Sequence, residues 1–388
     1  MSNVIFPKNF LFGAGLCDYQ HFGGSTCDLP TIPAAKHALY FEEDFGLLEK
    51  LKLNALRTSI EWARIEPEEN KINKNSVRFY HKYFSKLKKT GVTTIVTLHH
   101  FTNPNWVHNY GGWLSEKTVE KFLRYVDFVS QEFDENIDYY VTINEPTIYS
   151  QLAYEAVERG LPPFHRNRKE AKQCLENMNE AIKRSYEIIH ENSKKAKVGV
   201  ANDTSILQPW RRLLRWSLSR LAPELVIDSP IEKWEGKYDF CGINYYCKMS
   251  LGKPVPYPEG LRKICRDFFK KFKKPILITE NGLANREDRQ RTAYLLLHLK
   301  SLNDVVVRDK TNIIGYCWWS FLHGYEWGLG YKPFFALVDV DTSDSYRRTP
   351  TQTAHAFSKI IENHGFSLEL LKENCDSLTS QLRFKDWL

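Results

Sequence analysis

The 388-residue sequence lacks several features that would indicate other classes of protein. It has no run of about 18 apolar residues, so no membrane-spanning helix is expected. The stretch from Met1 to Pro7 has neither a basic n-region nor an apolar h-region, and we expect no secretory signal. No Ser/Gly-rich linker or low-complexity tract divides the chain, which predicts one domain over residues 1–388.

The eight cysteines are dispersed, without CxxC or Cys/His spacing, so the sequence predicts no metal centre. Four of them, Cys17, Cys241, Cys247 and Cys317, lie in or beside expected strands, where a thiol acts as a small apolar group. Reduced thiols and a cytoplasmic location are therefore predicted. Disulfides would require export of the chain.

The net charge of +7 is small for this length, and basic residues are mixed with acidic ones. The lysines at 86–89 and 270–274 are typical of solvated helix faces, so no nucleic-acid partner is predicted. The segment Trp210–Leu221 has a leucine stripe beside four arginines. This pattern is found in helices that lie on a membrane or a partner protein, and also in the outer helices of a barrel. We favour the second interpretation, a barrel helix. No pattern indicates an oligomeric state.

Aromatic residues make up 14% of the chain, with ten Trp and twenty Tyr. A large core would use them. A carbohydrate site would also use them, because the C–H faces of pyranose rings pack on indole and phenol rings. Composition alone leaves both interpretations open.

Short apolar runs alternate with segments of helical periodicity from one end of the chain to the other. The helical pattern is clear at Phe41–Leu51 and Val119–Phe133. The eight apolar runs are Phe10–Leu16, Asn54–Ile60, Thr93–Leu98, Tyr139–Asn144, Lys197–Ala201, Phe240–Tyr245, Pro275–Thr279 and Ile313–Phe321. Eight such units with short connections predict an α/β protein, a single (β/α)8 TIM barrel with its active site at the C-terminal ends of the strands.

Two of these runs end in a glutamate followed by turn-forming residues. Glu145 lies in the string TINEP and Glu280 in the string ITENG. Cleavage of a glycosidic bond takes two carboxyl groups, one to protonate the departing oxygen and one to meet the developing oxocarbenium ion. Both glutamates are therefore candidates for that chemistry.

With these strings at strand ends, the chain resembles family 1 of the glycoside hydrolases, the retaining β-glucosidase and β-galactosidase family. The likeness runs from Phe6 to about Ile361 and includes WARIEP, TLHHFTNPNW, GGWL, DFCGINYY and WWSFLHGYEW. The resemblance implies that Glu145 is the acid/base and Glu280 the nucleophile. An ionised Glu280 nearby would raise the pKa of Glu145 and keep it protonated.

Further site residues follow from the same resemblance. Arg57 matches the arginine beside the nucleophile, Tyr246 the phenol that donates to the same carboxylate, and Asn144 the amide that binds the sugar 2-hydroxyl. In the implied glycone pocket, Trp319 is an indole platform under the sugar ring and Phe335 covers the 6-hydroxymethyl group. The side chains implied to bind hydroxyl groups are Gln20, His100, Glu326 and Trp327. His99 is expected to be a packed strand residue.

Departures from the family pattern gather at the mouth of the predicted barrel. Where the family usually has Gln-Ile-Glu-Gly, this sequence has His21 after Gln20. The tryptophan that usually follows the second histidine is replaced by Phe101, and the usual Asp-Asn is replaced by His323-Gly324. The usual Arg-Phe-Gly is Phe334–Ala336, and the stretch from Asn202 to Asp239 is short. Because specificity for the leaving group resides at the mouth, these changes leave the aglycone and the exact hydroxyl pattern undetermined.

The sequence therefore predicts a retaining exo-β-glycosidase that hydrolyses terminal non-reducing β-D-glucosyl, galactosyl or fucosyl residues. Its substrate would be a small β-glycoside or oligosaccharide. No metal or organic cofactor is needed, because carboxyl groups supply both proton transfer and covalent catalysis. Two alternatives stay open, a transglycosylase of the same mechanism and a catalytically silent sugar-binding barrel. A 6-phosphoglycosidase is disfavoured, because the Glu326 carboxylate would repel the phosphate.

Overall fold

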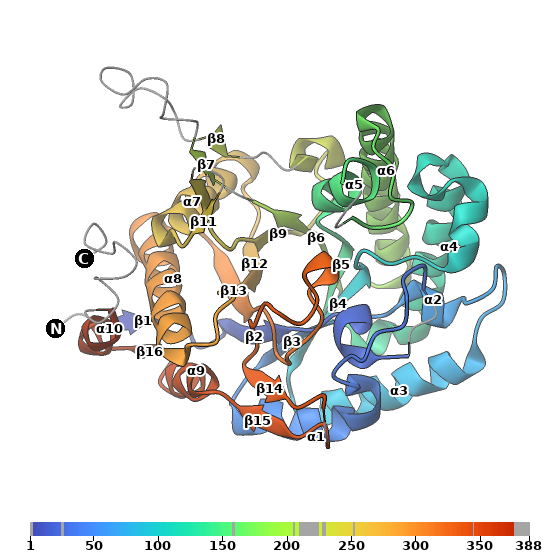
Figure 1. Ribbon diagram of the computed structural model, residues 1–388. Coiled ribbons are helices and arrows are strands. Elements are labelled where there is room, and N and C mark those ends of the chain that lie inside the picture. The colour runs from blue at the N-terminus through green and yellow to red at the C-terminus, as the bar shows by residue number, and fades with distance from the viewer. Residues whose placement is uncertain are drawn as a thin grey trace.

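The architecture is a closed eight-stranded parallel barrel surrounded by helices (Figure 1). The computed structural model describes residues 3–24, 27–156, 160–204, 206–208, 225–226, 230–250, 253–343 and 345–375. The barrel strands are β2 (Leu11–Gly15), β3 (Ala55–Ser59), β4 (Thr93–His99), β5 (Tyr139–Asn144), β6 (Lys197–Asp203), β9 (Phe240–Asn244), β12 (Ile276–Asn281) and β13 (Ile313–Trp318). Parallel pairing of β13 with β2 closes the barrel, and each strand lies in one of the eight predicted runs or overlaps it. The (β/α)8 prediction is confirmed.

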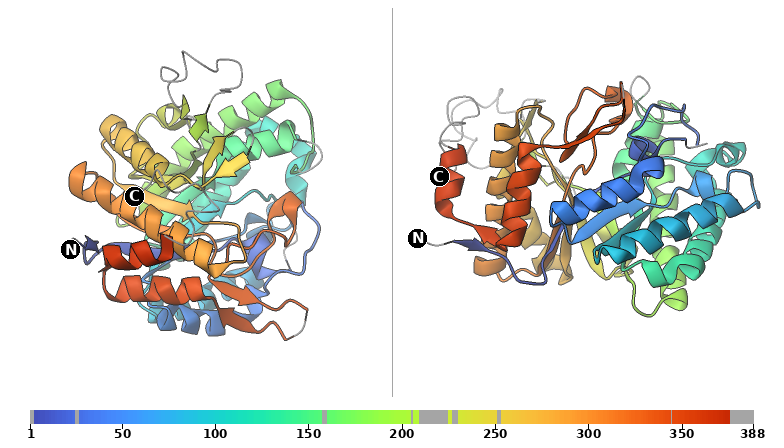
Figure 2. Two further views of the ribbon diagram at one scale, coloured as in Figure 1. Left: turned by 60° about the vertical axis from the view of Figure 1, so that its left-hand side comes forward. Right: turned by 90° about the horizontal axis from the view of Figure 1, so that it is seen from below.

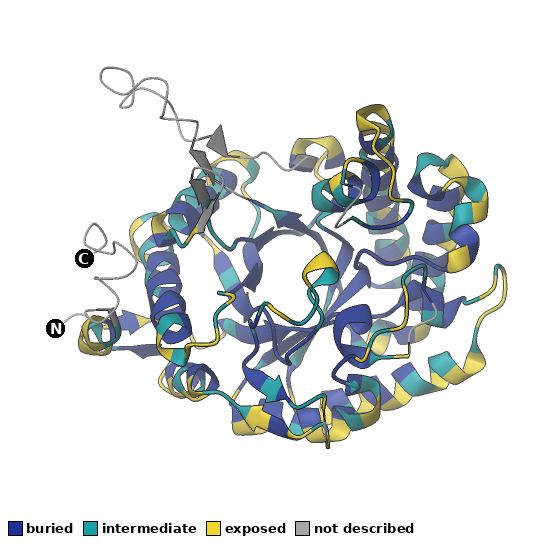
Figure 3. Ribbon diagram, in the orientation of Figure 1, coloured by how far each residue is buried: buried dark blue, intermediate teal, exposed yellow. Residues whose placement is uncertain are grey.

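The barrel strands are buried along most of their length because both of their faces are covered. Every residue of β3, β9 and β12 is buried, which explains why these strands show no alternation of apolar and polar residues. Inside the barrel Phe240 occupies the space beside Gly199, where a Cβ would lie 2.6 Å from the phenyl ring. Figure 3 shows the strands buried, with exposed residues on the outward sides of the helices.

Long amphipathic helices form the outer layer, which Figure 2 shows from two further directions. They are α1 (His37–Lys50), α3 (Lys74–Lys89), α4 (Glu116–Phe133), α6 (Arg168–Asn192), α7 (Pro258–Phe272), α8 (Asp288–Arg308) and α9 (Gln352–Glu362). The sequence pattern had placed the start of α4 at Val119. The helix begins at Glu116, because the Ser115 hydroxyl accepts a hydrogen bond from the Lys117 N–H at 3.2 Å and caps the first turn.

Shorter elements complete the fold. The short helical segments are η1 (Asp18–Phe22), α2 (Trp62–Ile65), η2 (Asn105–Tyr110), η3 (Gly112–Leu114), η4 (Asp134–Asn136), α5 (Pro146–Tyr154), η5 (Pro230–Trp234), η6 (Trp327–Leu329) and α10 (Leu368–Cys375). A four-stranded sheet joins β7 (Ile206–Gln208), β8 (Leu225–Val226), β10 (Lys248–Ser250) and β11 (Lys253–Val255). Two antiparallel pairs unite β1 (Val4–Ile5) with β16 (Gly365–Phe366), and β14 (Val338–Val340) with β15 (Arg348–Pro350).

The structure bears on three further predictions, which concern the basic segment, the cysteines and membrane-spanning helices. The basic segment Trp210–Leu221 lies outside them, so its predicted helix stays a prediction. The cysteines whose side chains are described are free thiols. Among the described residues, every helix is too short or too polar to cross a membrane.

Candidate active site

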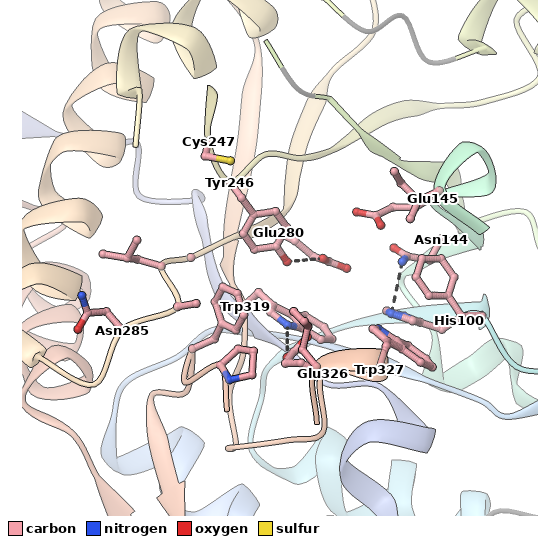
Figure 4. Close-up of a pocket in the computed structure, with 18 of the residues that line it drawn as sticks. His100, Asn144, Glu145, Tyr246, Cys247, Glu280, Asn285, Trp319, Glu326 and Trp327 are labelled. Carbon is pink, nitrogen blue, oxygen red and sulfur yellow. Dashed lines mark hydrogen bonds between the residues drawn. The ribbon is translucent and has the colours of Figure 1, made fainter. Parts of the chain in front are cut away.

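Nine of the eleven predicted site residues line one cavity of about 560 Å³ at the carboxyl ends of the barrel strands. They are His100, Asn144, Glu145, Tyr246, Glu280, Trp319, Glu326, Trp327 and Phe335. Figure 4 shows the carboxyl groups of Glu145 and Glu280 pointing toward each other across this cavity. The parallel barrel brings them together because every strand ends at the same rim.

Glu280, in β12, is held by two donors that approach different oxygens of its carboxylate. Arg57, in β3, donates from Nη1 to Oε1 in a buried ion pair. Tyr246 donates its hydroxyl to Oε2 at 2.6 Å. Charge-assisted hydrogen bonds of this kind fix the orientation of a carboxylate. The charge of Glu280 in turn adds to burial in raising the pKa of the Tyr246 phenol, which stays a donor.

Glu145 has a different environment. It directly precedes helix α5 in a left-handed backbone conformation, with φ 44°, and its Oε1 accepts a hydrogen bond from Asn244 Nδ2 at 2.7 Å. Burial is the main cause that raises the pKa of Glu145 well above its ordinary value, and the charges of Glu280 and Asp203 add to it. The raised pKa favours the protonated form, which suits a proton donor. The effect of Glu280 was predictable from the sequence, whereas the larger effect of burial depends on the folded structure.

A continuous hydrogen-bond network joins the two carboxyl groups. Asn144 Oδ1 accepts from Arg57 Nη2 at 2.6 Å and from Asn244 Nδ2 at 3.1 Å, so it lies between the partners of Glu280 and Glu145. The Asn144 amide also contacts His100 Nε2 at 3.3 Å. The two carboxyls are thus parts of one electrostatic unit.

Asn244 was missed by the sequence analysis. It is the last residue of strand β9, as Asn144 is of β5, and the one amide within the apolar run Phe240–Tyr245 was the available signal. Its Oδ1 accepts from Thr279 Oγ1 at 2.7 Å, which fixes the amide orientation so that Nδ2 faces Glu145.

Aromatic rings form one side of the cavity. The His100 ring lies nearly parallel to the indoles of Trp319 and Trp327, with ring centroids 5.7 and 6.0 Å away. Burial and the nearby Arg57 charge hold the pKa of His100 well below its ordinary value, so the imidazole is neutral. Trp319 Nε1 donates to Glu326 Oε1 at 3.1 Å, and burial raises the pKa of Glu326 to about 7.

Two predicted site residues lie behind the cavity lining rather than in it. Arg57 is buried beneath Glu280. Gln20 is also buried, and its Nε2 donates to the Tyr325 carbonyl at 2.9 Å while the amide bonds to Glu326 as well. The buried Oε1 of Gln20 has no protein partner. As predicted, His99 is packed, with its ring edge-on against Trp113 and Tyr149.

Two of the departures from the family pattern touch each other. A Cβ at Gly324 would lie 2.5 Å from Nε2 of His21, so the glycine makes room for the imidazole. Burial lowers the pKa of His21 to about 3, and the neutral ring donates from Nε2 to the Leu322 carbonyl at 3.1 Å. Its ring also packs edge-on against Trp319 at 5.7 Å. His21 thus ties η1 to the loop that carries Trp319.

The described residues include no group of three or more His, Cys, Asp or Glu side chains placed to hold a metal ion. The chemistry available at this site is that of two carboxyl groups, one with a raised pKa and one paired with a guanidinium. Such a pair can protonate a leaving group and form a covalent bond to the carbon it leaves.

The sequence matches the model of a known protein family. The family model described as "Glycosyl hydrolase family 1" matches residues 31–217 and 248–366. These ranges contain every predicted site residue except Gln20 and Tyr246.

The curated relatives differ in their named activities. The galactolipid galactosyltransferase SFR2 of Arabidopsis thaliana is 31% identical over 377 residues, which cover 85% of this chain and 59% of that protein. The chain thus spans less than two thirds of the length of this relative. The cytosolic beta-glucosidase of Homo sapiens is 27% identical, and the match covers 95% of this chain and all of that protein.

Among solved structures, the beta-glycosidase from Pyrococcus horikoshii superimposes with a TM-score of 0.83 at 26% identity. The match covers 96% of this chain and 98% of the other.

Proposed function

Because this chain belongs to glycosyl hydrolase family 1, we propose that it is a retaining exo-β-glycosidase. It removes a terminal non-reducing β-D-glucosyl, galactosyl or fucosyl residue through a covalent glycosyl-enzyme. The observation that carries this proposal is that Glu145 and Glu280 share one cavity but have partners of different charge. The partner of Glu145 is a neutral amide, whereas the partner of Glu280 is a positively charged guanidinium.

In the first step a carboxylate oxygen of Glu280 attacks the anomeric carbon as the glycosidic C–O bond breaks. Glu145 gives its proton to the departing oxygen. The resulting ester on Glu280 carries no charge, so the contribution of Glu280 to the raised pKa of Glu145 is lost and that pKa falls. In the second step Glu145 takes a proton from water, the water oxygen bonds to the anomeric carbon, and the ester bond breaks. Both carboxyl groups then return to their starting states.

The remaining lining residues serve the sugar. Asn144 binds the 2-hydroxyl, where contacts strengthen in the transition state. Trp319 supports the ring, and Phe335, whose ring lies 5.7 Å from that of Tyr246, covers the 6-hydroxymethyl group. His100, Glu326 and Trp327 bind the other hydroxyls, and Gln20, behind the lining, holds the Glu326 carboxyl group. The ionised form of Glu326 disfavours a 6-phosphate.

Two variants test the assignment of roles. Glu280→Ala and Glu145→Ala each lower hydrolysis of an aryl β-glucoside by several orders of magnitude. Added azide partly restores Glu280→Ala with an α-glycosyl azide as product, and restores Glu145→Ala with the β-anomer. The matched control is Glu68→Ala, since this side chain is 69% exposed on the surface. If azide gives neither product, the roles are wrong.

A second candidate is transfer of the glycosyl group to an alcohol or sugar in place of water. It shares the first step of hydrolysis. Two observations favour it, the galactosyltransferase named among the relatives and the aliphatic outer wall of the cavity, where Ile148, Leu152 and Leu283 lie. A transferase converts most of its aryl glycoside into a new glycoside when millimolar glycerol or galactoside is present. A hydrolase releases equal amounts of phenol and free sugar under the same conditions.

A further inference from the structure

The cavity has two chemically different halves. The inner half holds both carboxyl groups, the stacked rings of His100, Trp319 and Trp327, and the Tyr246 phenol. The outer half is mainly aliphatic. Its lining residues are Ile148, Leu152, Pro256, Leu283, Ala284, Leu329 and Pro333, with the Cys247 thiol and the amides of Asn285 and Gln290.

The aliphatic wall begins at the carboxyl groups and runs outward. On α5 the residue three positions after Glu145 is Ile148, and Leu152 follows one turn later on the same side of the helix. The rise of an α-helix places Leu152 about 10 Å along the axis from Glu145. On the opposite side, Leu283 comes three positions after Glu280. At the rim Leu329 is 50% exposed.

The two amides of the outer half are already occupied. Asn285 Nδ2 donates to Gln290 Oε1 at 2.7 Å, and Asn285 Oδ1 accepts from the Glu287 N–H at 2.8 Å. Gln290 Nε2 donates to Glu287 Oε2 at 2.6 Å. A second sugar ring here would lose hydrogen bonds to water and gain few from the described lining. An alkyl chain would lose none and would bury its methylene groups.

From this division we infer that the outer half of the cavity binds a flexible alkyl or acyl chain on the leaving group, so that the preferred substrates are lipid-like β-glycosides. The sugar occupies the inner half and the chain lies along Ile148, Leu152 and Leu283. This inference rests on the proposed glycosidase function and adds the class of aglycone to it.

A series of methyl, butyl, hexyl and octyl β-glucosides, each below its critical micelle concentration, tests the inference. Each methylene group that enters the outer half raises kcat/KM about threefold, and the gain ends once the chain passes the rim. A value of kcat/KM that does not change with chain length overturns the inference. So does a preference of tenfold or more for cellobiose, whose leaving group is a sugar, over the octyl glucoside. If no glycoside in the series releases glucose, it is the glycosidase proposal that fails.

A pair of leucine variants locates the chain. Leu152→Ser reduces the gain per methylene group to about half, because a hydroxymethyl group replaces the isobutyl group against the chain. Leu39→Ser is the matched control, since Leu39 is 76% exposed on α1 and retains the wild-type gain. The gain is a ratio of kcat/KM values measured on the same variant, so a lower fraction of correctly folded enzyme does not change it. A wild-type gain in Leu152→Ser means that the chain does not follow this wall.

Discussion

Two clusters of the same chemical parts lie at the same end of the barrel. The catalytic cluster contains Glu145, Glu280, Arg57 and Tyr246. The sealed cluster contains Asp18, Glu61, Arg64 and Tyr80. In the sealed cluster Arg64 Nε contacts both Asp18 oxygens at 2.8 Å, and the Tyr80 hydroxyl donates to Asp18 at 3.0 Å. An arginine, a phenol and two acids therefore occur twice.

The perturbation of the acids is also similar. Burial and the charge of Asp18 raise the pKa of Glu61 to about 8. Burial and the charge of Glu280 raise the pKa of Glu145 in the same direction. A perturbed pKa is commonly taken as a sign of an active site, but here it marks both clusters equally.

Access separates the two clusters. Glu145 and Glu280 line the main cavity, whereas no member of the sealed cluster does. Asp18 is fully buried, and Glu61 is 4% exposed with its Oε2 accepting from the Thr102 hydroxyl at 2.8 Å. A raised pKa therefore reports burial, while a reaction also needs space for a substrate beside the carboxyl group.

The two arginines give the largest expected difference. Arg57→Met lowers kcat of an aryl β-glucoside about 10²–10³-fold, because the partner charge of the nucleophile is lost. Arg64→Met leaves kcat within about threefold but lowers the free energy of unfolding by about 3 kcal/mol, because Asp18 is left buried without its partner. Steady-state kinetics and urea unfolding of both variants measure this. Equal losses of activity would mean that the sealed cluster takes part in the reaction.

The next difference is in pH dependence. Between about pH 4.5 and 8 folded Glu61 holds a proton that the unfolded chain has lost, so its contribution to stability falls as pH rises. Glu61→Gln removes this loss, and its stability relative to wild type rises by on the order of 1 kcal/mol per pH unit across that range. The alkaline limb of kcat/KM, which follows deprotonation of Glu145, is unchanged. Parallel stability curves for the two proteins would exclude Glu61 as the source.

The smallest effect concerns η1, which carries Asp18 of the sealed cluster as well as His21. Gly324→Ala places a Cβ against His21 Nε2 and displaces the ring that packs on Trp319. KM for an aryl β-glucoside rises a few-fold, and kcat changes little. Gly46→Ala is the control, because nothing lies within 4 Å of its added Cβ on helix α1. Identical KM values for both variants would show that His21 does not position the platform.

The barrel and most of the site could be predicted from the sequence for a physical reason. Strands covered on both faces are apolar over most of their length, so their runs stand out, and a polar residue at the end of such a run is conspicuous. The family is confirmed by the model that matches most of the chain. The roles of Glu145 and Glu280, the single domain and the cytoplasmic location stay predictions.

Other features leave no local signal. The strands β7, β8, β10 and β11 are two or three residues long and exist through their pairing partners. The burial of Asp18 could not be predicted, because no pattern in the sequence tells which charged residue will be buried. Gln20 was expected in the pocket, but its position behind the lining depends on contacts with residues about 300 positions away, such as Tyr325.

The backbone of Glu145 carries a further consequence. A φ of 44° is a conformation that glycine and asparagine adopt at lower cost than glutamate does. Evolution toward heat resistance alone would therefore favour replacing this residue with a smaller one, and the fold would gain while turnover was lost. Directed evolution of a hardier enzyme should hold position 145 fixed and seek its improvements elsewhere.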